Sequence, residues 1–228
     1  MKCVNALNWR QKTWNKIAGP WDVLVIGGGI TGAGILRMAT DLGLKALLVE
    51  YNDFAWGTSS RSGKLVHGGL RYLKQGQVNV TRHSVGERER LLREAPGLVN
   101  VLEFLLPFYS GQGRLRASYR VGLGIYDLLA GRKTRRSCSA EELSGQIPAI
   151  DREGLRGGFG YQDAYTDDAR LVLRLILEAV ADGGEAINYA PVTGLLFDRS
   201  GRVSGAAVKD RVTGATAEVE AKVVINAT

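Results

Sequence analysis

The sequence contains little cysteine and little histidine. Its 228 residues include two cysteines, Cys3 and Cys138, and two histidines, His67 and His83. Two cysteines cannot build a disulfide framework, and these four residues lack the spacing of a structural zinc site. The composition therefore excludes small disulfide-rich and zinc-stabilised folds, and it predicts reduced thiols in a reducing compartment.

The sequence also lacks a long hydrophobic run. No apolar stretch approaches the roughly 18 residues of a membrane span, and residues 1–20 contain no continuous apolar segment of a signal peptide. We therefore expect a cytoplasmic protein. Residues 1–20, with Trp9 and Trp14 among basic residues, are expected to form a loosely held N-terminal arm. A short amphipathic segment resting on a membrane surface is the alternative.

Glycine, by contrast, is abundant. It accounts for 30 of the 228 residues, whereas about 7% is usual in globular domains. The absence of a repeated Gly-X-Y pattern excludes collagen, so the excess belongs to turns and close backbone approaches. With 45% hydrophobic and 23% charged residues, the chain can bury a core and is long enough for one or two domains.

The net charge of +7 is concentrated in one segment. Residues 111–136 hold seven basic side chains and one acidic side chain, Asp127. Such a segment suits nucleic acid, anionic lipid or a phosphorylated ligand, or it is a solvated basic loop. We expect no nucleic-acid binding, because the segment contains neither a known module nor interleaved aromatic residues.

Short apolar runs and turn residues predict the order of the elements. A buried strand over Trp21–Ile26, a helix over Ile30–Leu42 and a second buried strand over Lys45–Glu50 form a βαβ unit, and hence a parallel sheet. Further helices are expected over Glu87–Glu94, Tyr119–Leu129 and Thr166–Ala181. Further strands are expected over Glu185–Tyr189, Gly194–Asp198, Val203–Asp210, Ala215–Val219 and Ala221–Asn226.

The start of the helix over Thr166–Ala181 carries two neighbouring carboxylates. We expect Thr166 to cap this helix. Asp167 and Asp168 then suit the positive N-terminal end of its dipole. Their placement favours a structural role over acid–base work.

The first predicted strand is followed by the motif G-x-G-x-x-G, which begins at Gly27 and includes Gly28, Ile30 and Thr31 between its defining glycines. In a βαβ unit, Gly27 permits a tight turn, Gly29 lets the backbone approach a pyrophosphate, and Gly32 lets the helix pack closely. The free N–H groups of the helix would bind that pyrophosphate. Glu50, at the end of the second strand, would accept hydrogen bonds from a ribose. The pattern predicts a dinucleotide and leaves NAD and FAD open.

A second motif favours FAD over NAD, through its resemblance to a known family. The run from Thr58 to Leu73, TSSRSGKLVHGGLRYL, resembles the signature of the flavin-dependent glycerol-3-phosphate dehydrogenases, as do GGGITGAG at Gly27–Gly34, Tyr126–Leu129 and Asp167–Leu173. The resemblance extends from Trp21 to Thr228. It implies FAD as cofactor and an α/β fold: a glutathione-reductase-type FAD-binding Rossmann domain with an inserted substrate domain. In the family, the closing flavin motif continues beyond Asn226–Thr228 into a Gly-Pro, so the expectation is a chain truncated at its C-terminus.

The resemblance also implies a domain division. It places an N-terminal arm at 1–20, the first segment of the FAD-binding domain at 21–76 and the substrate-domain insertion at 77–158. The second segment of the FAD-binding domain then covers 159–228 and is expected to be incomplete.

Site residues follow from the same resemblance. Thr58 and Ser59 would contact the FAD pyrophosphate or ribityl chain, and Val192 would lie beside the adenine. Lys64, Leu65, Val66 and His67 would pass the isoalloxazine ring, and Gly68 and Gly69 would let the backbone run close to it. Arg71 and Tyr72 would face the substrate, with His67 the third candidate catalytic residue.

Each of these residues also has a simpler interpretation. His67 suits a positioning role better than proton transfer. Thr58, Ser59 and Lys64 would otherwise be polar loop residues. Arg71 would otherwise pair with a structural carboxylate, and Tyr72 would otherwise be a core aromatic residue.

The function implied is oxidation of sn-glycerol 3-phosphate to dihydroxyacetone phosphate by hydride transfer to flavin. Electrons would pass to a quinone, or to oxygen in an oxidase, and the protein would lie peripherally on the anionic inner face of the membrane. A homodimer is a further expectation. The alternatives are a related flavoenzyme acting on an amine or a 2-hydroxy acid, and a non-catalytic nucleotide-binding fragment.

Overall fold

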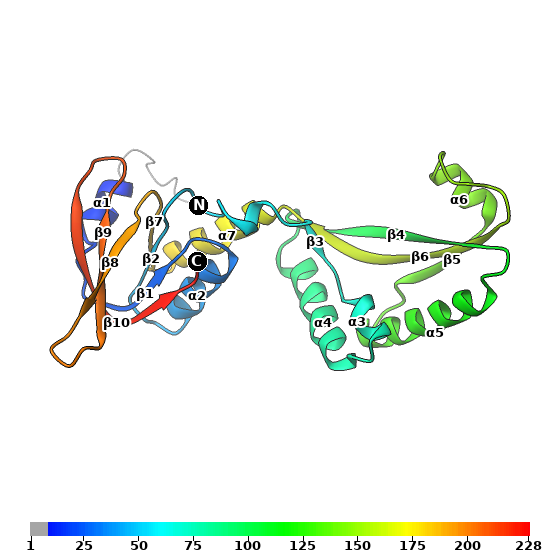
Figure 1. Cartoon of the computed structure of the whole chain (residues 1–228), viewed down its shortest axis with the longest axis horizontal. Coiled ribbons are helices and arrows are strands. Elements are labelled where there is room, and N and C mark those ends of the chain that lie inside the picture. The colour runs from blue at the N-terminus through cyan, green and yellow to red at the C-terminus, as the bar shows by residue number, and fades with distance from the viewer. Residues whose placement is uncertain (1–8) are drawn as a thin grey trace. The chain divides into compact units, whose positions relative to one another are not determined.

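The computed structural model describes residues 9–228, which divide into two compact units (Figure 1). Unit 1 contains residues up to Ser62 and from Asp168 to Thr228, and unit 2 contains Gly63–Asp167. These limits differ from the sequence-based limits at 76/77 and 158/159, because unit 2 includes the whole of β6 (Leu155–Thr166) and the strand β3 (Leu65–Val66) that pairs with it. The assignment of the FAD and substrate domains stays a prediction.

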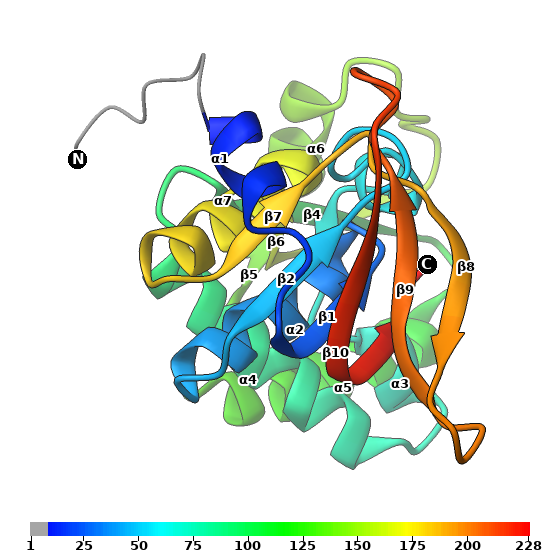
Figure 2. The same ribbon diagram turned by 90° about the vertical axis from the view of Figure 1, so that its left-hand side faces the viewer.

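Unit 1 is built on a six-stranded sheet with the order β7-β2-β1-β10-β9-β8. The strands β7, β2, β1 and β10 are parallel, whereas β10, β9 and β8 form an antiparallel meander. Figure 2 shows β2, β1 and β10 side by side. The strands are β1 (Trp21–Ile26), β2 (Ala46–Val49), β7 (Glu185–Ile187), β8 (Val192–Phe197), β9 (Val203–Lys209) and β10 (Thr216–Asn226).

Successive apolar side chains of β1 point to opposite faces of the parallel sheet, so each face has an apolar layer. Val23 and Val25 pack in a cluster with residues of α2 (Ile30–Asp41) and α7 (Asp168–Ala181). Leu24, which points the opposite way, packs in a second cluster with residues of β9 and β10. The predicted βαβ unit is confirmed, and its sheet is covered by helices on one side and mainly by the meander on the other.

The strand β10 is longer than the sequence pattern indicated. Two strands were expected, over Ala215–Val219 and Ala221–Asn226, but a single strand covers Thr216–Asn226. Its partner changes between consecutive residues, since Glu220 pairs with Gly205 of β9 and Ala221 pairs with Trp21 of β1. The expectation of two strands is wrong because the strand continues without a break while its pairing partner changes from β9 to β1.

The predicted helix over Thr166–Ala181 is confirmed from Asp168 onward. The expected cap is wrong, because Thr166 is the last residue of β6, where it pairs with Val99. The carboxylate of Asp168 accepts hydrogen bonds from Ser62 Oγ at 2.7 Å and from the Ala169 N–H at 2.9 Å. Asp168 therefore has the structural role that its place at a helix start predicts.

The N-terminal segment is not a loose arm where the structure describes it. Residues Trp9–Asn15 form α1. Trp14 and Ile17 pack in the second apolar cluster, and Thr13 Oγ1 and Lys16 Nζ each donate to Glu185 at 2.7 Å. The burial of these apolar side chains also argues against a membrane-surface segment here. Residues 1–8, including Cys3, lie outside the described residues.

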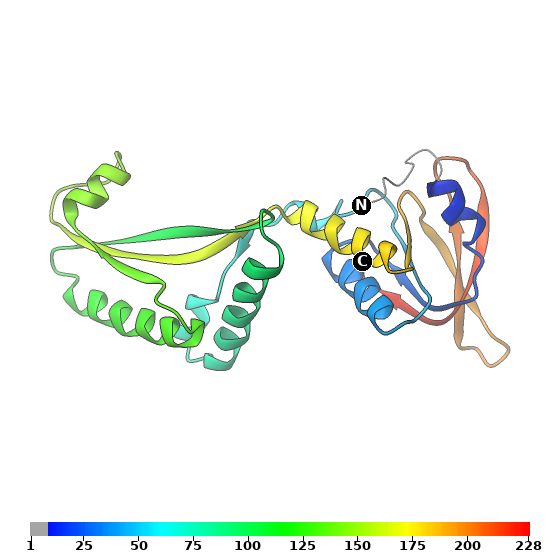
Figure 3. The same cartoon turned by 180° about the vertical axis from the view of Figure 1, so that it is seen from behind.

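Unit 2 is an antiparallel sheet with helices. Its strands follow the order β3-β6-β4, and β5 also pairs with β6. The helices expected over 87–94 and 119–129 are confirmed as parts of longer helices, α4 and α5, which lie on one face of the sheet (Figure 3). Its remaining elements are β4 (Val99–Tyr109), β5 (Arg135–Cys138), α3 (Leu70–Lys74), α4 (Val78–Glu94), α5 (Gly113–Ala130) and α6 (Ala140–Gln146). Among residues 9–228, no helix is long and apolar enough to cross a membrane.

The basic segment 111–136 carries less free charge than its composition suggests. Three of its arginines form ion pairs within unit 2, which places part of the segment among acidic side chains. These pairs are Arg132 with Glu89 at 2.9 Å, Arg135 with Asp127 at 3.1 Å, and Arg136 with Glu103 at 2.6 Å. Arg114, Arg120 and Lys133 are exposed.

Candidate cofactor-binding site

A cavity of about 560 Å³ lies within unit 1 at the carboxyl ends of its parallel strands. Its walls come from the turn after β1, from residues 49–51 at the end of β2 and from residues 56–59, which lead into the short 3-10 helix η1 (Thr58–Ser60). Ala190 and Val192 line another side, and Ala227 and Thr228 follow β10. Cofactors bind at this edge of open α/β sheets.

The turn after β1 is shaped by two glycines. Gly27 has a φ of +113°, a backbone conformation that favours glycine. A Cβ added to Gly32 would overlap Gly27 O and lie 3.3 Å from Val25 Cγ1. Because neither residue tolerates a side chain, the helix α2 starts directly against the end of β1, as the motif predicts.

The N-terminus of α2 opens on the cavity. The cavity is lined here by Gly27, Gly29, Ile30 and Thr31. The residue at the N-cap, Gly29, has no side chain that could cap the helix. The Ile30 N–H donates to Ser59 Oγ at 2.9 Å. Backbone donors and the positive end of the helix dipole form a setting that binds phosphate oxygens. Gly28 and Gly32, also assigned to the cofactor, are not among the lining residues and support the turn instead.

Glu50 lines the cavity where β2 ends and is held in place by the backbone. One carboxylate oxygen accepts from the Gly28 N–H at 2.6 Å, and the other accepts from the Asn52 N–H at 2.7 Å. Each oxygen keeps a second lone pair, so the carboxylate still accepts hydrogen bonds from ribose hydroxyls. Its negative charge disfavours a 2′-phosphate.

The structure adds residues to the predicted set. Thr58, Ser59 and Val192 line the cavity, and so do Tyr51, Trp56, Ala190, Ala227 and Thr228. The contacts of these residues with FAD stay a prediction. The rule that parallel strands end at one edge would have indicated residues 227–228, since β10 lies next to β1. Trp56 had no sequence signal beyond being an aromatic residue before the Gly57-Thr58 turn. Its exposed ring lies 5.0 Å from the Arg61 guanidinium carbon.

A clamp from the N-terminal helix holds one wall of the cavity. Arg10 of α1 donates to Asn188 O at 2.7 Å and forms an ion pair with Asp210. Burial acts to raise the pKa of Asp210, but hydrogen bonds from Arg10 and from the Val212 N–H outweigh it and lower that pKa. Two positions after Asn188, the Ala190 N–H donates to Glu50 O at 2.7 Å. The clamp therefore fixes the loop that carries Ala190.

The remaining predicted site residues belong to unit 2. Lys64, Leu65 and Val66 lie at β3, which pairs with β6. His67 and the α3 residues Arg71 and Tyr72 are exposed. Arg71 forms no ion pair with the other described residues, which argues against the structural-carboxylate interpretation. The exposure of Tyr72 likewise argues against a core aromatic. Their contacts with flavin and substrate stay predictions.

Taken together, the parallel sheet, the glycine turn, the carboxylate after β2 and the meander leading into β10 define an FAD-binding Rossmann fold of the glutathione-reductase type. Residues 22–228 match the family described as FAD dependent oxidoreductase. The chain therefore belongs to the FAD-dependent oxidoreductase family.

Comparisons with individual proteins point to one branch of that family. The chain is 42% identical over 210 residues to the aerobic glycerol-3-phosphate dehydrogenase of Staphylococcus aureus (strain USA300). That alignment covers 91% of this chain and 38% of the relative. The FAD complex of glycerol-3-phosphate dehydrogenase from Bacillus halodurans has a TM-score of 0.72 and 35% identity, over 96% of this chain and 36% of that one. L-proline dehydrogenase from P. horikoshii, at 17% identity and a TM-score of 0.66, shares the fold.

Proposed function

We propose that this protein oxidises sn-glycerol 3-phosphate to dihydroxyacetone phosphate with FAD as its cofactor. The observation that carries the proposal is the 42% identity to an aerobic glycerol-3-phosphate dehydrogenase over 91% of the chain. The run from His67 to Tyr72, which carries the sequence resemblance, lies inside the matched region. The chain spans 38% of the length of that relative, so the activity is proposed for the protein as a whole.

The residues of the unit 1 cavity fit an FAD molecule. The N–H groups at the start of α2 would hold the pyrophosphate, together with Thr58 and Ser59. Glu50 would accept hydrogen bonds from the adenosine ribose, because the backbone already orients its carboxylate toward the cavity. Gly32, with no space for a Cβ, keeps the helix end close enough to serve this site.

The residues proposed for substrate come from unit 2. When bound, FAD accepts a hydride from the secondary alcohol carbon of the substrate. Arg71 would bind the phosphate through its planar guanidinium, and Tyr72 would donate its hydroxyl to a substrate oxygen. His67 would position the flavin or the substrate, while Lys64, Leu65 and Val66 would pass the flavin with their backbone.

The spectrum of the purified protein with FAD tests this proposal. We expect a bound flavin band that bleaches under anaerobic conditions when glycerol 3-phosphate is added, and that stays unchanged with glycerol or proline. The Glu50→Ala variant should bind FAD at least tenfold more weakly, since a charged hydrogen-bond partner contributes about 1.5–3 kcal/mol. Glu178→Ala, at an exposed ion pair on α7, is the matched control. A bound flavin band that does not bleach when glycerol 3-phosphate is added would contradict the proposed substrate.

We further propose that the electrons pass to a membrane quinone and that α5 docks on the anionic membrane surface. Val121, Ile125 and Leu128 are exposed at helical spacing, with Leu128 80% accessible. Arg114 and Arg120 are exposed on the same helix. Apolar side chains beside basic ones suit the boundary between lipid headgroups and acyl chains.

Sedimentation with anionic vesicles tests the docking surface. Leu128→Ser should reduce the bound fraction, because the substitution removes apolar area at the contact. Val212→Ser changes another exposed aliphatic residue, in unit 1, and should leave vesicle binding unchanged. Equal loss in both variants, or no binding to anionic vesicles by the unaltered protein, would contradict this surface.

A further inference from the structure

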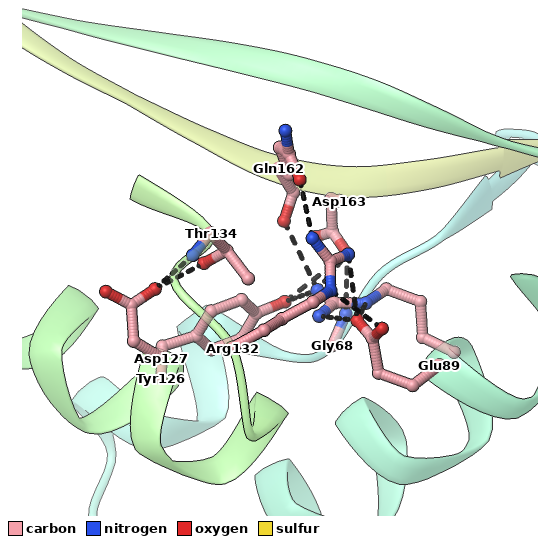
Figure 4. Close-up of polar contacts among 9 residues, drawn as sticks. Gly68, Glu89, Tyr126, Asp127, Arg132, Thr134, Gln162 and Asp163 are labelled. Atoms are coloured by element: carbon pink, nitrogen blue, oxygen red, sulfur yellow. Dashed lines mark hydrogen bonds and ion pairs between the residues drawn. The ribbon is translucent and has the colours of Figure 1, made fainter. Parts of the chain in front are cut away.

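Unit 2 buries a complete arginine side chain. Arg88 of α4 is 0% exposed and is the largest fully buried side chain among the described residues. Its guanidinium contacts Tyr126 of α5 and Asp163 of β6. Figure 4 shows these two residues together with Glu89 and Arg132. A buried cation is costly unless it is paired and hydrogen-bonded, so the contacts of Arg88 show what the residue does.

The guanidinium of Arg88 has partners in three directions. Nη1 donates to the Tyr126 hydroxyl at 2.6 Å and to Asp163 Oδ1 at 3.1 Å, and Nη2 donates to Glu89 Oε1 at 2.6 Å. Arg132 donates to Glu89 Oε2 at 2.9 Å. Two arginines therefore face two carboxylates, which balances the buried charge.

The network ends at the backbone of the Gly68-Gly69 pair. Asp163 Oδ1, which accepts from Arg88, also accepts from the Gly68 N–H at 2.9 Å. Thr81 Oγ1 of α4 donates to Gly69 O at 3.2 Å. Both glycines are buried. The peptide groups on both sides of the pair are thus fixed to α4 and β6.

The same network explains why residue 68 is glycine. A Cβ added to Gly68 would overlap the Tyr126 hydroxyl and lie 2.7 Å from Val85 Cγ2. The glycine pair was expected to allow a close approach to the flavin ring. Within unit 2, glycine at position 68 is required by the side chains that pack against it.

The glycine pair leads directly into α3. Gly69 has a φ of +76° and precedes Leu70, the first residue of the helix. Arg71 and Tyr72 occupy the next two positions and are exposed. Because α3 has five residues, its direction depends on the backbone that enters it.

We infer that Arg88, Tyr126 and Asp163 are positioning residues that hold the Gly68-Gly69 backbone and thereby orient Arg71 and Tyr72 toward the substrate. This inference rests on the proposed function for the roles of Arg71 and Tyr72. The hold on the glycine pair stands on the contacts within unit 2 alone. None of the three positioning residues needs to touch the substrate.

The protonation states of the network support one stable arrangement. Burial, followed by the charge of Asp163, raises the pKa of the Tyr126 phenol far above its ordinary value. Tyr126 therefore keeps its proton near neutral pH. Burial acts to raise the pKa of Glu89, but hydrogen bonds from Arg132 and Arg88 outweigh it, so that pKa is lowered and the carboxylate stays ionised.

Two conservative variants weaken the hydrogen-bond network while keeping most of its contacts. Tyr126→Phe keeps the ring and removes the hydroxyl between Arg88 and Asp163. Asp163→Asn keeps an oxygen acceptor for the Gly68 N–H but removes the charge opposite Arg88. The control is Arg90→Gln, which removes an arginine from the exposed side of the same helix. Asp163→Ala removes the acceptor altogether and should have a stronger effect than Asp163→Asn if it folds.

Two measurements on the full-length protein test the inference. Hydrogen exchange at the Gly68 amide should become about tenfold faster in Tyr126→Phe, as expected for the loss of a buried hydrogen bond. The KM for glycerol 3-phosphate should rise about tenfold, with rates normalised to bound flavin. A fall in stability alone would reduce the flavin-loaded fraction but leave KM unchanged. Arg90→Gln should match the unaltered protein in both measurements.

The outcomes separate the inference from the proposed function. Exchange at Gly68 that stays unchanged in both network variants would overturn the hold on the glycine pair. Faster exchange with unchanged KM and kcat would overturn the orienting role. If the unaltered protein binds FAD but does not react with glycerol 3-phosphate, the proposed function fails, and with it the orienting role. The exchange data then decide the hold on the glycine pair by themselves.

Discussion

The interiors of the two units contrast in chemistry. The fully buried large side chains of unit 1 are aliphatic, among them Leu24, Leu36 and Leu47, and they lie on both faces of a sheet. In unit 2 the two largest are Arg88 and Tyr126, in contact with each other. The largest buried side chains of unit 1 are thus aliphatic, although it also buries the smaller Asp210, paired with Arg10. In unit 2 the largest buried side chain is itself a charged partner in an ion pair.

This difference matches the kind of site that each unit carries. The cavity of unit 1 is formed largely by backbone at the ends of strands, held by close packing at the glycine turn and by Arg10 at the Ala190 loop. The candidate residues of unit 2 follow a glycine pair in a five-residue helix, which is too short to fix its own direction. A network of directional hydrogen bonds supplies the orientation there. The two units should accordingly fail in different ways when they are altered.

The largest effect is expected from Arg88→Met. Removing one partner of a buried ion pair leaves the buried Asp163 without its cation, whereas Glu89 keeps Arg132. Unit 2 should lose about 3–5 kcal/mol of unfolding free energy. Unit 1 should keep its stability. Hydrogen exchange resolved by segment measures the two units separately. An equal loss of protection in unit 1 would contradict the contrast drawn here.

Gly32→Ala should produce the next largest effect, and in the other unit. The added methyl group overlaps Gly27 O, so unit 1 should lose about 1–3 kcal/mol and its affinity for FAD should fall at least tenfold. Titration of flavin fluorescence measures that affinity. Gly34→Ala, in the same helix and with nothing within 4 Å of its added Cβ, should bind FAD normally. If both variants bind equally well, the close approach at Gly32 is unimportant.

Arg10→Met should lower the stability of unit 1 by about 1.5 kcal/mol, because it removes charged hydrogen bonds to Asn188 and Asp210. FAD affinity should fall with it, since the loop that carries Ala190 is released. Thermal unfolding and flavin titration measure the two effects. Lys16→Met, at an exposed ion pair with Glu185, should change both much less. The reverse order would show that α1 acts only through its surface charge.

Acid should affect the two units through different carboxylates. The folded-state pKa of Glu89 in unit 2 lies below its ordinary value of 4.5, and that of Asp210 in unit 1 lies below its ordinary value of 3.8. Each stabilises the fold above its ordinary pKa, and the contribution is lost as pH falls through the folded-state pKa. The unfolding free energy should be measured between pH 7 and pH 3. In Glu89→Gln it should decrease less with falling pH in unit 2, and it should be unaffected in unit 1. A weaker pH dependence of unit 1 in the Glu89→Gln variant would contradict the assignment of Glu89 to unit 2 stability.

The smallest effect is expected from Arg90→Gln on the exposed side of α4. Its ion pairs with Glu87 and Glu94 are in contact with solvent, and such pairs contribute about 0–1 kcal/mol. Unfolding of unit 2 should therefore shift little. A loss comparable to that of Arg88→Met would show that charge removal from α4, rather than burial, decides the outcome.

Several features of the chain could be predicted from local sequence. The βαβ unit, its glycine turn and the carboxylate after β2 were all predicted, because strand alternation, helix periodicity and glycine spacing act over a few neighbouring residues. Of the predicted cofactor residues in unit 1, most line the cavity. Trp56 and Tyr51 were missed because an exposed aromatic residue gives no local signal of the cavity it lines.

Other features depended on segments that meet only in the folded chain. The ion pairs of Arg132, Arg135 and Arg136 reduce the free charge of a segment that looks strongly basic in sequence. Thr166 belongs to a strand rather than a cap because Val99, far along the chain, pairs with it. Local patterns cannot show such partners.

The sequence by itself determined the dinucleotide-binding turn, since the glycine spacing after a buried strand is a local pattern and the space at Gly32 is limited by the nearby Gly27 and Val25. Only the tertiary structure decided that β10 is one strand, because its pairing changes from β9 to β1 at consecutive residues. Only the tertiary structure brought Arg88 to Asp163, 75 positions away. Such a pair forms only in the folded chain, because a charge that is removed from water must be paired and hydrogen-bonded to be stable.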